Sequence, residues 1–234
     1  MPAPGNRHDR ATTATSGHAH YAPGVILLSD PRVLAVPVRE CGEPLAEVTG
    51  VPGLALDPRE RDGDGAFGRV REGVLTRLAA AAAALPDGLR FLVIEGYRTM
   101  AEQSRRFAAY QDHLRETGIT DPAELHRQAS MFVSPSEVAP HCAGAAVDLT
   151  LVDGEGTELD MGVAVNGYTG AGGKLCPFAA AGVPAAARRN RDLLAAALTG
   201  AGFVNYPTEW WHWSFGDRYW ALLTGADAAR YGPL

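Results

Sequence analysis

The sequence has few of the features that mark several common classes of protein. Its three cysteines, Cys41, Cys142 and Cys176, are an odd number at no zinc-finger spacing, which favours a reduced, cytoplasmic protein without a disulfide framework. The longest purely apolar run, residues 78–85, is too short to cross a bilayer. There is no run of lysine or arginine and the formal net charge is −6, so neither nucleic acid nor an anionic membrane is expected as a partner.

Composition separates a short N-terminal stretch from the rest. Residues 1–24 are rich in alanine, threonine, glycine, proline and histidine and lack the apolar core of a signal peptide, so we expect a flexible segment. A length of 234 residues suits one large domain or two small ones, and 46% hydrophobic with 21% charged residues is ordinary for a globular protein. Because no internal repeat divides them, residues 25–234 are expected to form one domain.

Apolar periodicity and capping signals predict four helices. They begin at Phe67, Thr99, Asp121 and Pro184. An alanine run extends the first helix until Pro86 stops it, and the third should end near Phe132.

Strands are predicted between these helices. They cover residues 24–38, where Asp30-Pro31 interrupts short apolar runs, and residues 89–95, 145–153, 203–207 and 210–216. The glycine-rich residues 154–183 are expected to be an irregular excursion, a lid or a rim. Helices and strands follow one another without a βαβ rhythm, which favours an α+β fold with a central antiparallel sheet flanked by helices.

The stretch "PHCAGAAVDLTLVD" carries the pattern H-x-x-G-x-A-x-D, with His141 and Asp148 at its ends. They are seven positions apart, too far for adjacent ligands on one helix face, but a bend at Gly144 in an extended segment would let them converge. Zinc hydrolases use three protein ligands and keep one position for water. His212 would supply the third ligand and leave Glu209, three residues earlier, beside the metal.

Structural explanations compete with this interpretation. A lone histidine near a strand is more often hydrogen-bonded than metal-bound, and E-x-x-H alone is weak evidence. Asp148 is harder to dismiss, because a buried carboxylate without a partner is costly. Three of the four tryptophans, Trp210, Trp211 and Trp213, surround His212. They would brace a bend at Glu209 and exclude water, although core packing alone accounts for at least two of them.

Three segments together, "HCAGAAVDLTL", "GYR" and "EWWHW", resemble the zinc D-alanyl-D-alanine dipeptidases of the VanX type, within the M15 peptidase family. The resemblance implies one zinc ion per chain, bound by His141, Asp148 and His212. It implies that Glu209 is the general base and that Arg98 stabilises the tetrahedral intermediate. The family fold is a small α+β domain with a central antiparallel sheet, shared with D,D-carboxypeptidases and the hedgehog signalling domain.

Three departures from the family pattern concern the substrate. Ala139 stands where many relatives have serine, and Glu95 replaces the aspartate of D-G-Y-R. Asn166 in "MGVAVNG" occupies the position of an acidic residue that receives the substrate's ammonium group. Glu95 and Asp160 are the remaining candidates for that contact, although Asp160 is as readily explained as a turn residue.

Two alternatives stay open at this point. The chain could be a D,D-carboxypeptidase or another murein-peptide amidase with the same zinc centre, or a catalytically silent zinc module that binds peptide. Retention of Glu209 and Arg98 favours an enzyme, since a structural zinc requires neither. Cys142 adjoins His141, but sequence neighbours rarely form a catalytic pair. A small peptide is the expected partner, no protein partner is indicated, and the role could be glycopeptide resistance, recycling or biosynthesis.

Overall fold

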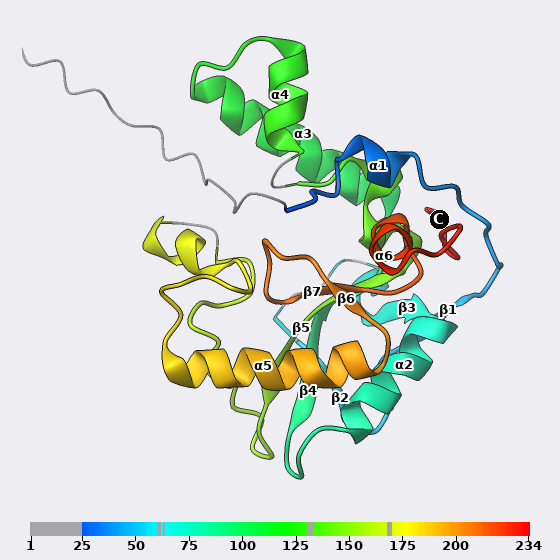
Figure 1. Ribbon diagram of the computed structural model, residues 1–234, viewed down its shortest axis with the longest axis vertical. Helices are drawn as coiled ribbons and strands as arrows, with labels where there is room; N and C mark the ends of the chain where they lie inside the picture. The colour runs from blue at the N-terminus through cyan, green and yellow to red at the C-terminus, as the bar shows by residue number, and fades with distance from the viewer. Residues whose placement is uncertain (1–24, 60–61, 63, 131–132, 168–169) are drawn as a thin grey trace, which may run out of the picture.

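A five-stranded sheet organises the chain, with its strands in the order β2-β4-β5-β7-β6 (Figure 1). The computed structural model describes residues 25–234 except 60–61, 63, 131–132 and 168–169, so the expected N-terminal segment 1–24 lies outside the described residues. The strands are β2 (Leu54–Leu56), β4 (Arg90–Glu95), β5 (Ala146–Val152), β6 (Val204–Asn205) and β7 (His212–Ser214). β2 and β4 are parallel and every other neighbouring pair is antiparallel, which agrees with the predicted α+β class.

Helices cover one face of this sheet and extend beyond its ends. The α-helices are α1 (Pro31–Leu34), α2 (Glu72–Ala83), α3 (Met100–Glu116), α4 (Pro122–Ala129), α5 (Ala185–Gly200) and α6 (Arg218–Thr224). Short 3-10 helices are η1 (Ala66–Gly68), η2 (Ser136–Val138), η3 (Pro140–Ala143) and η4 (Gly170–Leu175). Figure 1 shows α5 crossing the sheet with α2 beside it, while α3 and α4 project from the body as a hairpin.

The main core lies between the sheet and the helices α2 and α5. Alternate residues of β5, namely Val147, Leu149 and Leu151, belong to this core together with apolar residues of both helices. Because successive strand residues point to opposite faces, Asp148 must project from the other face. All seven residues of β5 are buried, so this carboxylate sits in the middle of the protein.

Several predicted elements are present and others are wrong. Thr99 and Asp121 cap α3 and α4 by accepting hydrogen bonds from Glu102 N and Glu124 N, at 3.2 and 2.8 Å. The third helix ends at Ala129 instead of near residue 132, which itself lies outside the described residues. The described residues between 154 and 183 are irregular apart from the 3-10 turn η4 and a single bridge from Glu158 to Val152, as expected.

Two errors of the sequence reading lie in the first third of the chain. The helix predicted from Phe67 begins only at Glu72, because β3 (Arg69–Arg71) pairs with β1 (Leu45–Glu47) and removes those residues from the helical run. The strand expected after residue 24 is replaced by α1, which the Asp30 side chain caps by accepting from Arg32 N. Tertiary pairing and a local N-cap overrode the apolar patterns on which both predictions relied.

The register of the sheet places three polar residues in one row. Glu95 of β4 is opposite Asp148 of β5, and Asp148 is opposite His212 of β7. Directly paired residues on neighbouring strands share a face, so the three side chains emerge together on the face away from α2 and α5.

Within the described part of the chain, no helix is both long enough and apolar enough to cross a membrane.

Candidate metal centre and active site

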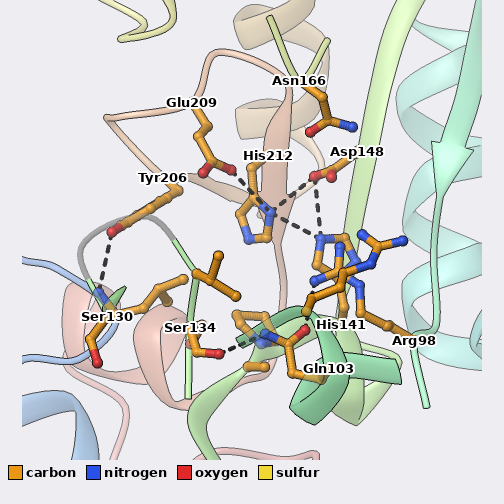
Figure 2. Close-up of a pocket in the computed structure, with 15 residues that line it drawn as sticks. Arg98, Gln103, Ser130, Ser134, His141, Asp148, Asn166, Tyr206, Glu209 and His212 are labelled. Carbon is orange, nitrogen blue, oxygen red and sulfur yellow. Dashed lines mark hydrogen bonds and ion pairs between the residues drawn. The ribbon is translucent and has the colours of Figure 1, made fainter. Parts of the chain in front are cut away.

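One cavity, of about 260 Å³, brings most of the predicted site residues together (Figure 2). The predicted residues that line it are Arg98, His141, Asp148, Asn166, Glu209 and His212. In Figure 2 the side chains of Glu209, Asp148 and His141 all point toward His212. Residues up to 114 positions apart in the sequence, from Arg98 to His212, therefore meet in one place.

Three possible ligand atoms converge at the centre of this cavity. Asp148 Oδ1 lies 3.0 Å from His212 Nδ1 and 3.3 Å from His141 Nε2, and the two ring nitrogens are 3.1 Å apart. The side chains are buried, each about 5% exposed. One oxygen and two imidazole nitrogens are a usual donor set for a three-ligand zinc site.

The protonation of the two histidines fits a bound cation. His141 Nδ1 lies 2.7 Å from the carbonyl oxygen of Gly96, which can only accept, so this nitrogen carries the ring proton and Nε2 presents a lone pair. His212 Nδ1 faces that lone pair and the Asp148 carboxylate, yet a neutral ring has at most one proton to give. A cation would satisfy all three donors at once, so the residues present fit a metal ion.

Charge at the centre is set by Asp148. Burial would raise the pKa of its carboxyl group, but the adjoining His141 and His212 rings outweigh burial and hold this pKa below its ordinary range. The lowered pKa favours the ionised carboxylate, which is the form that binds a metal.

His141 is positioned by the 3-10 turn η3 and its surroundings. Arg98 N donates to the His141 carbonyl at 3.1 Å, and buried Arg71 donates from Nε to Ala143 O at 2.8 Å. Gly144 closes the turn at φ 63°, in the left-handed region, where an added Cβ would also lie 2.6 Å from Leu45. Gly96 is needed for a different reason, because a Cβ there would collide with the Phe67 and Arg69 carbonyl oxygens.

Glu209 reaches the centre because the backbone turns before β7. Glu209 N donates to Tyr206 O at 2.9 Å and His212 N donates to Glu209 O at 3.2 Å, which confirms the predicted bend. Asn205 Nδ2 holds the loop by donating to the carbonyls of Glu209 and His212, both at 2.9 Å. Glu209 Oε2 lies 3.9 Å from His212 Nδ1, beside the three ligand atoms and separate from them.

The three tryptophans belong to the core. Trp210, Trp211 and Trp213 are at most 2% exposed, and none of them lines the cavity that contains His212. Trp213 Nε1 donates to Trp210 O at 3.1 Å across the turn, so one of them does brace the bend. Core packing explains the rest of the cluster. Because none of the three tryptophans lines the cavity, they do not exclude water from the site by direct contact.

Arg98 is held in place by two side chains. Its Nε and Nη2 donate to the two carboxylate oxygens of Glu95, both at 2.6 Å, and its Nη1 donates to Gln103 Oε1 at 2.6 Å. Burial lowers the pKa of Arg98, but the Glu95 carboxylate more than compensates, so the pKa lies above its usual value. Five N–H groups are available and three are used, which leaves donors for a substrate.

The sequence reading missed Gln103, which also donates from Nε2 to Ser134 O at 2.6 Å and so ties Arg98 to a loop of the cavity wall. Gln103 and Arg106 lie three residues apart on α3 and line the cavity together. Their i, i+3 spacing on a helix capped at Thr99 was the available signal.

The three residues expected to contact the substrate lie in different surroundings. Asn166 lines the cavity near Asp148 (Figure 2) and has φ 60°, a conformation that asparagine tolerates better than most residues. Asp160 lines a neighbouring cavity and accepts from Gly162 N at 2.7 Å. Both oxygens of Glu95 bind guanidinium groups, so the geometry favours a role in placing Arg98. The expected ammonium contacts of these three residues stay predictions.

Two further residues next to His141 can be assessed. Ala139 is buried and lines the cavity, which therefore has no hydroxyl at this position. Cys142 is buried, and burial raises the pKa of its thiol to about 12, so it is not poised as a thiolate nucleophile.

In sequence, the chain is similar to one peptidase family and to individual peptidases. A sequence profile of the Peptidase_M15 family, described as D-ala-D-ala dipeptidase, matches residues 70–224. A D-alanyl-D-alanine dipeptidase of Synechocystis sp. is 32% identical over 219 residues, covering 80% of this chain and 88% of the relative. A D-alanyl-D-alanine dipeptidase of Escherichia coli strain K12 is 32% identical over 126 residues, covering 54% of this chain and 55% of the relative.

Two solved peptidase structures also align with this chain. The LdcB LD-carboxypeptidase aligns with a TM-score of 0.45 and 16% identity, over 82% of this chain and 76% of that one. A zinc complex of the D,D-pentapeptidase VanY aligns with a TM-score of 0.40 and 18% identity, over 73% and 84% of the two chains. The profile match covers more than half of the sequence and the first relative covers most of it. The chain belongs to the M15 peptidase family of D-Ala-D-Ala dipeptidases and is a metallopeptidase.

Proposed function

We propose that the protein hydrolyses D-Ala-D-Ala, or a closely related dipeptide, with one Zn²⁺ held by His141, Asp148 and His212. The observation that carries the proposal is the convergence of their three donor atoms in a cavity that Glu209 and Arg98 also line. Two relatives at 32% identity are D-alanyl-D-alanine dipeptidases, which supports the choice of substrate.

Held by His141, Asp148 and His212, a zinc ion would supply Lewis-acid chemistry at the scissile carbonyl and would make water a better nucleophile. The protein residues supply the remaining functions. Glu209, placed beside the ligand atoms, accepts the proton of the attacking water and returns it to the leaving amine. Arg98 keeps its proton and directs its remaining N–H donors at the developing oxyanion.

The size of the cavity supports a small substrate. Its volume of about 260 Å³ falls just below the roughly 300–1,000 Å³ of common small-molecule pockets. Leu28, Val133, Pro140 and Tyr206 supply apolar surface to its walls, which suits methyl side chains. In a cytoplasmic setting such a dipeptidase would deplete a cell-wall precursor and favour altered precursors, as in glycopeptide resistance.

A D,D-carboxypeptidase is the second candidate, and Asn166 is the observation that favours it. A dipeptidase must bind an ammonium group close to the scissile bond, whereas a carboxypeptidase meets a neutral amide there. Asn166 lines the cavity without a charge, and Asp160 faces a different cavity. A silent zinc module is the weaker alternative, because it would need neither Glu209 nor Arg98 at the centre.

Separation of products by liquid chromatography tests these functions directly. The zinc-loaded protein is incubated with D-Ala-D-Ala, with its L,L isomer and with a D-Ala-D-Ala-terminated tripeptide, and Glu209→Gln serves as the inactive control. The proposal expects free alanine from the D,D dipeptide alone. Release of alanine only from the tripeptide would establish the carboxypeptidase, and no release from any of the three would favour the silent module.

A further inference from the structure

The cavity has a positively charged wall on the side of α3. Three arginines, Arg98, Arg105 and Arg106, share two carboxylates, Glu95 and Glu102. Three positive and two negative charges leave an excess of one positive charge in this cluster. Arg98 and Arg106 line the cavity, whereas Arg105 does not. Each of the two carboxylates is shared between two arginines, so neither lining arginine has a carboxylate of its own.

Arg106 is the less neutralised of the two lining arginines. Its Nε donates to Glu102 Oε1 at 2.7 Å and its Nη1 to Glu95 Oε2 at 3.2 Å, but each carboxylate is shared with another arginine. Its Nη2 has no hydrogen bond or ion pair with a described residue, and the side chain is 32% exposed. The guanidinium lies 5.5 Å from the centre of the Phe67 ring, which helps to fix its position.

We propose that Arg106 binds the free α-carboxylate of the peptide substrate and makes an unmodified C-terminus a requirement for tight binding. The inference rests on the proposed peptidase function and specifies how that site selects its substrate. A guanidinium with unused N–H donors is well matched to a carboxylate. Asn166 lines the same cavity and carries no charge.

Arg105 provides a matched control. It is the sequence neighbour of Arg106 and binds the same carboxylate, donating to Glu102 from Nε at 2.9 Å and from Nη2 at 2.7 Å. Its side chain is 72% exposed and lies outside the cavity lining. Substituting it removes one positive charge from the same helix without removing a group from the site.

The experiment compares D-Ala-D-Ala with its C-terminal amide in the wild type and in the Arg106→Gln, Arg106→Lys and Arg105→Gln variants. Binding is measured by calorimetry on zinc-loaded proteins that also carry Glu209→Gln, and hydrolysis is measured with Glu209 intact. Arg106→Gln should weaken binding of the acid, and raise its KM, by about tenfold, equivalent to ~1.4 kcal/mol, and leave the amide unchanged. Arg106→Lys should recover part of the loss, and Arg105→Gln should change neither ligand.

The outcomes separate this proposal from the proposed function. If Arg106 only supports Glu95 and Arg98, Arg106→Gln will lower kcat for acid and amide alike without a selective change in binding, and the proposal is wrong. The same conclusion follows if wild type does not prefer the acid. A selective loss of acid binding in Arg106→Gln, together with no hydrolysis of D-Ala-D-Ala by the protein with Glu209 intact, would support the carboxylate site. The same result would reject the dipeptidase activity.

Discussion

Replacing Glu95 with glutamine should destabilise the protein more than replacing both Glu95 and its partner Arg98. The two side chains are 4% and 12% exposed and form paired hydrogen bonds of 2.6 Å. Removing one member of a buried ion pair costs about 3–5 kcal/mol, because the other charge stays buried, whereas removing both members leaves no unpaired charge behind. Arg98 retains some exposure and a bond to Gln103, so we expect about 3 kcal/mol for Glu95→Gln.

Denaturant unfolding of the metal-free and zinc-loaded proteins measures this effect. The set comprises wild type, Glu95→Gln, Arg98→Met, the double variant and a control, Glu102→Gln. The control breaks ion pairs with the more exposed Arg105 and Arg106 and should cost at most about 1 kcal/mol. The double variant should be more stable than Glu95→Gln alone. A cost below about 1 kcal/mol for Glu95→Gln, or a double variant less stable than it, would refute the reasoning.

Four further outcomes are expected. His141→Ala and His212→Ala should each lose most of the roughly one zinc per chain found by metal analysis, and full retention in both would exclude them as ligands. Glu209→Gln should keep its zinc while turnover falls by roughly two to four decades, so near-normal turnover would remove it as the base. Asn166→Asp should lower KM for free D-Ala-D-Ala by about tenfold and leave the N-acetylated dipeptide unimproved, and an equal effect on both would contradict an ammonium contact. Asp57→Asn should cost about 1 kcal/mol at pH 7, because hydrogen bonds from Arg59 hold the Asp57 pKa below its usual value. That cost should be complete above about pH 4 and disappear as the pH falls through the lowered pKa in acid titrations of both proteins.

The three proposed metal ligands could be chosen from the sequence because each sits in a short pattern with its own chemical reason. Asp148 lies among apolar residues of a strand. His141 stands three residues before Gly144, which adopts a left-handed conformation that favours glycine. The pairing of Glu95, Asp148 and His212 in one row could not be predicted, because strand register depends on contacts between distant segments.

The remaining errors have similar physical causes. The helix predicted from Phe67 shared its apolar spacing with β3, and only pairing with β1 distinguishes the two. The role of Glu95 depends on Arg98 folding back three residues to meet it, which residue types alone do not reveal. Arg106 belongs to none of the motifs of the sequence, and its place in the cavity wall depends on how α3 packs.

The site divides into a rigid part and an adaptable part, and this division bears on substrate choice. Asp148 belongs to a fully buried central strand, and His212 begins the strand paired with it. The residues assigned to the substrate lie elsewhere, Asn166 on an exposed irregular segment and Arg106 on a helix that projects from the body. Substitutions in these two places can change which peptide ends are accepted without moving a metal ligand. One metal centre could therefore serve dipeptidases and carboxypeptidases alike, with charge at the two ends of the cavity deciding between them.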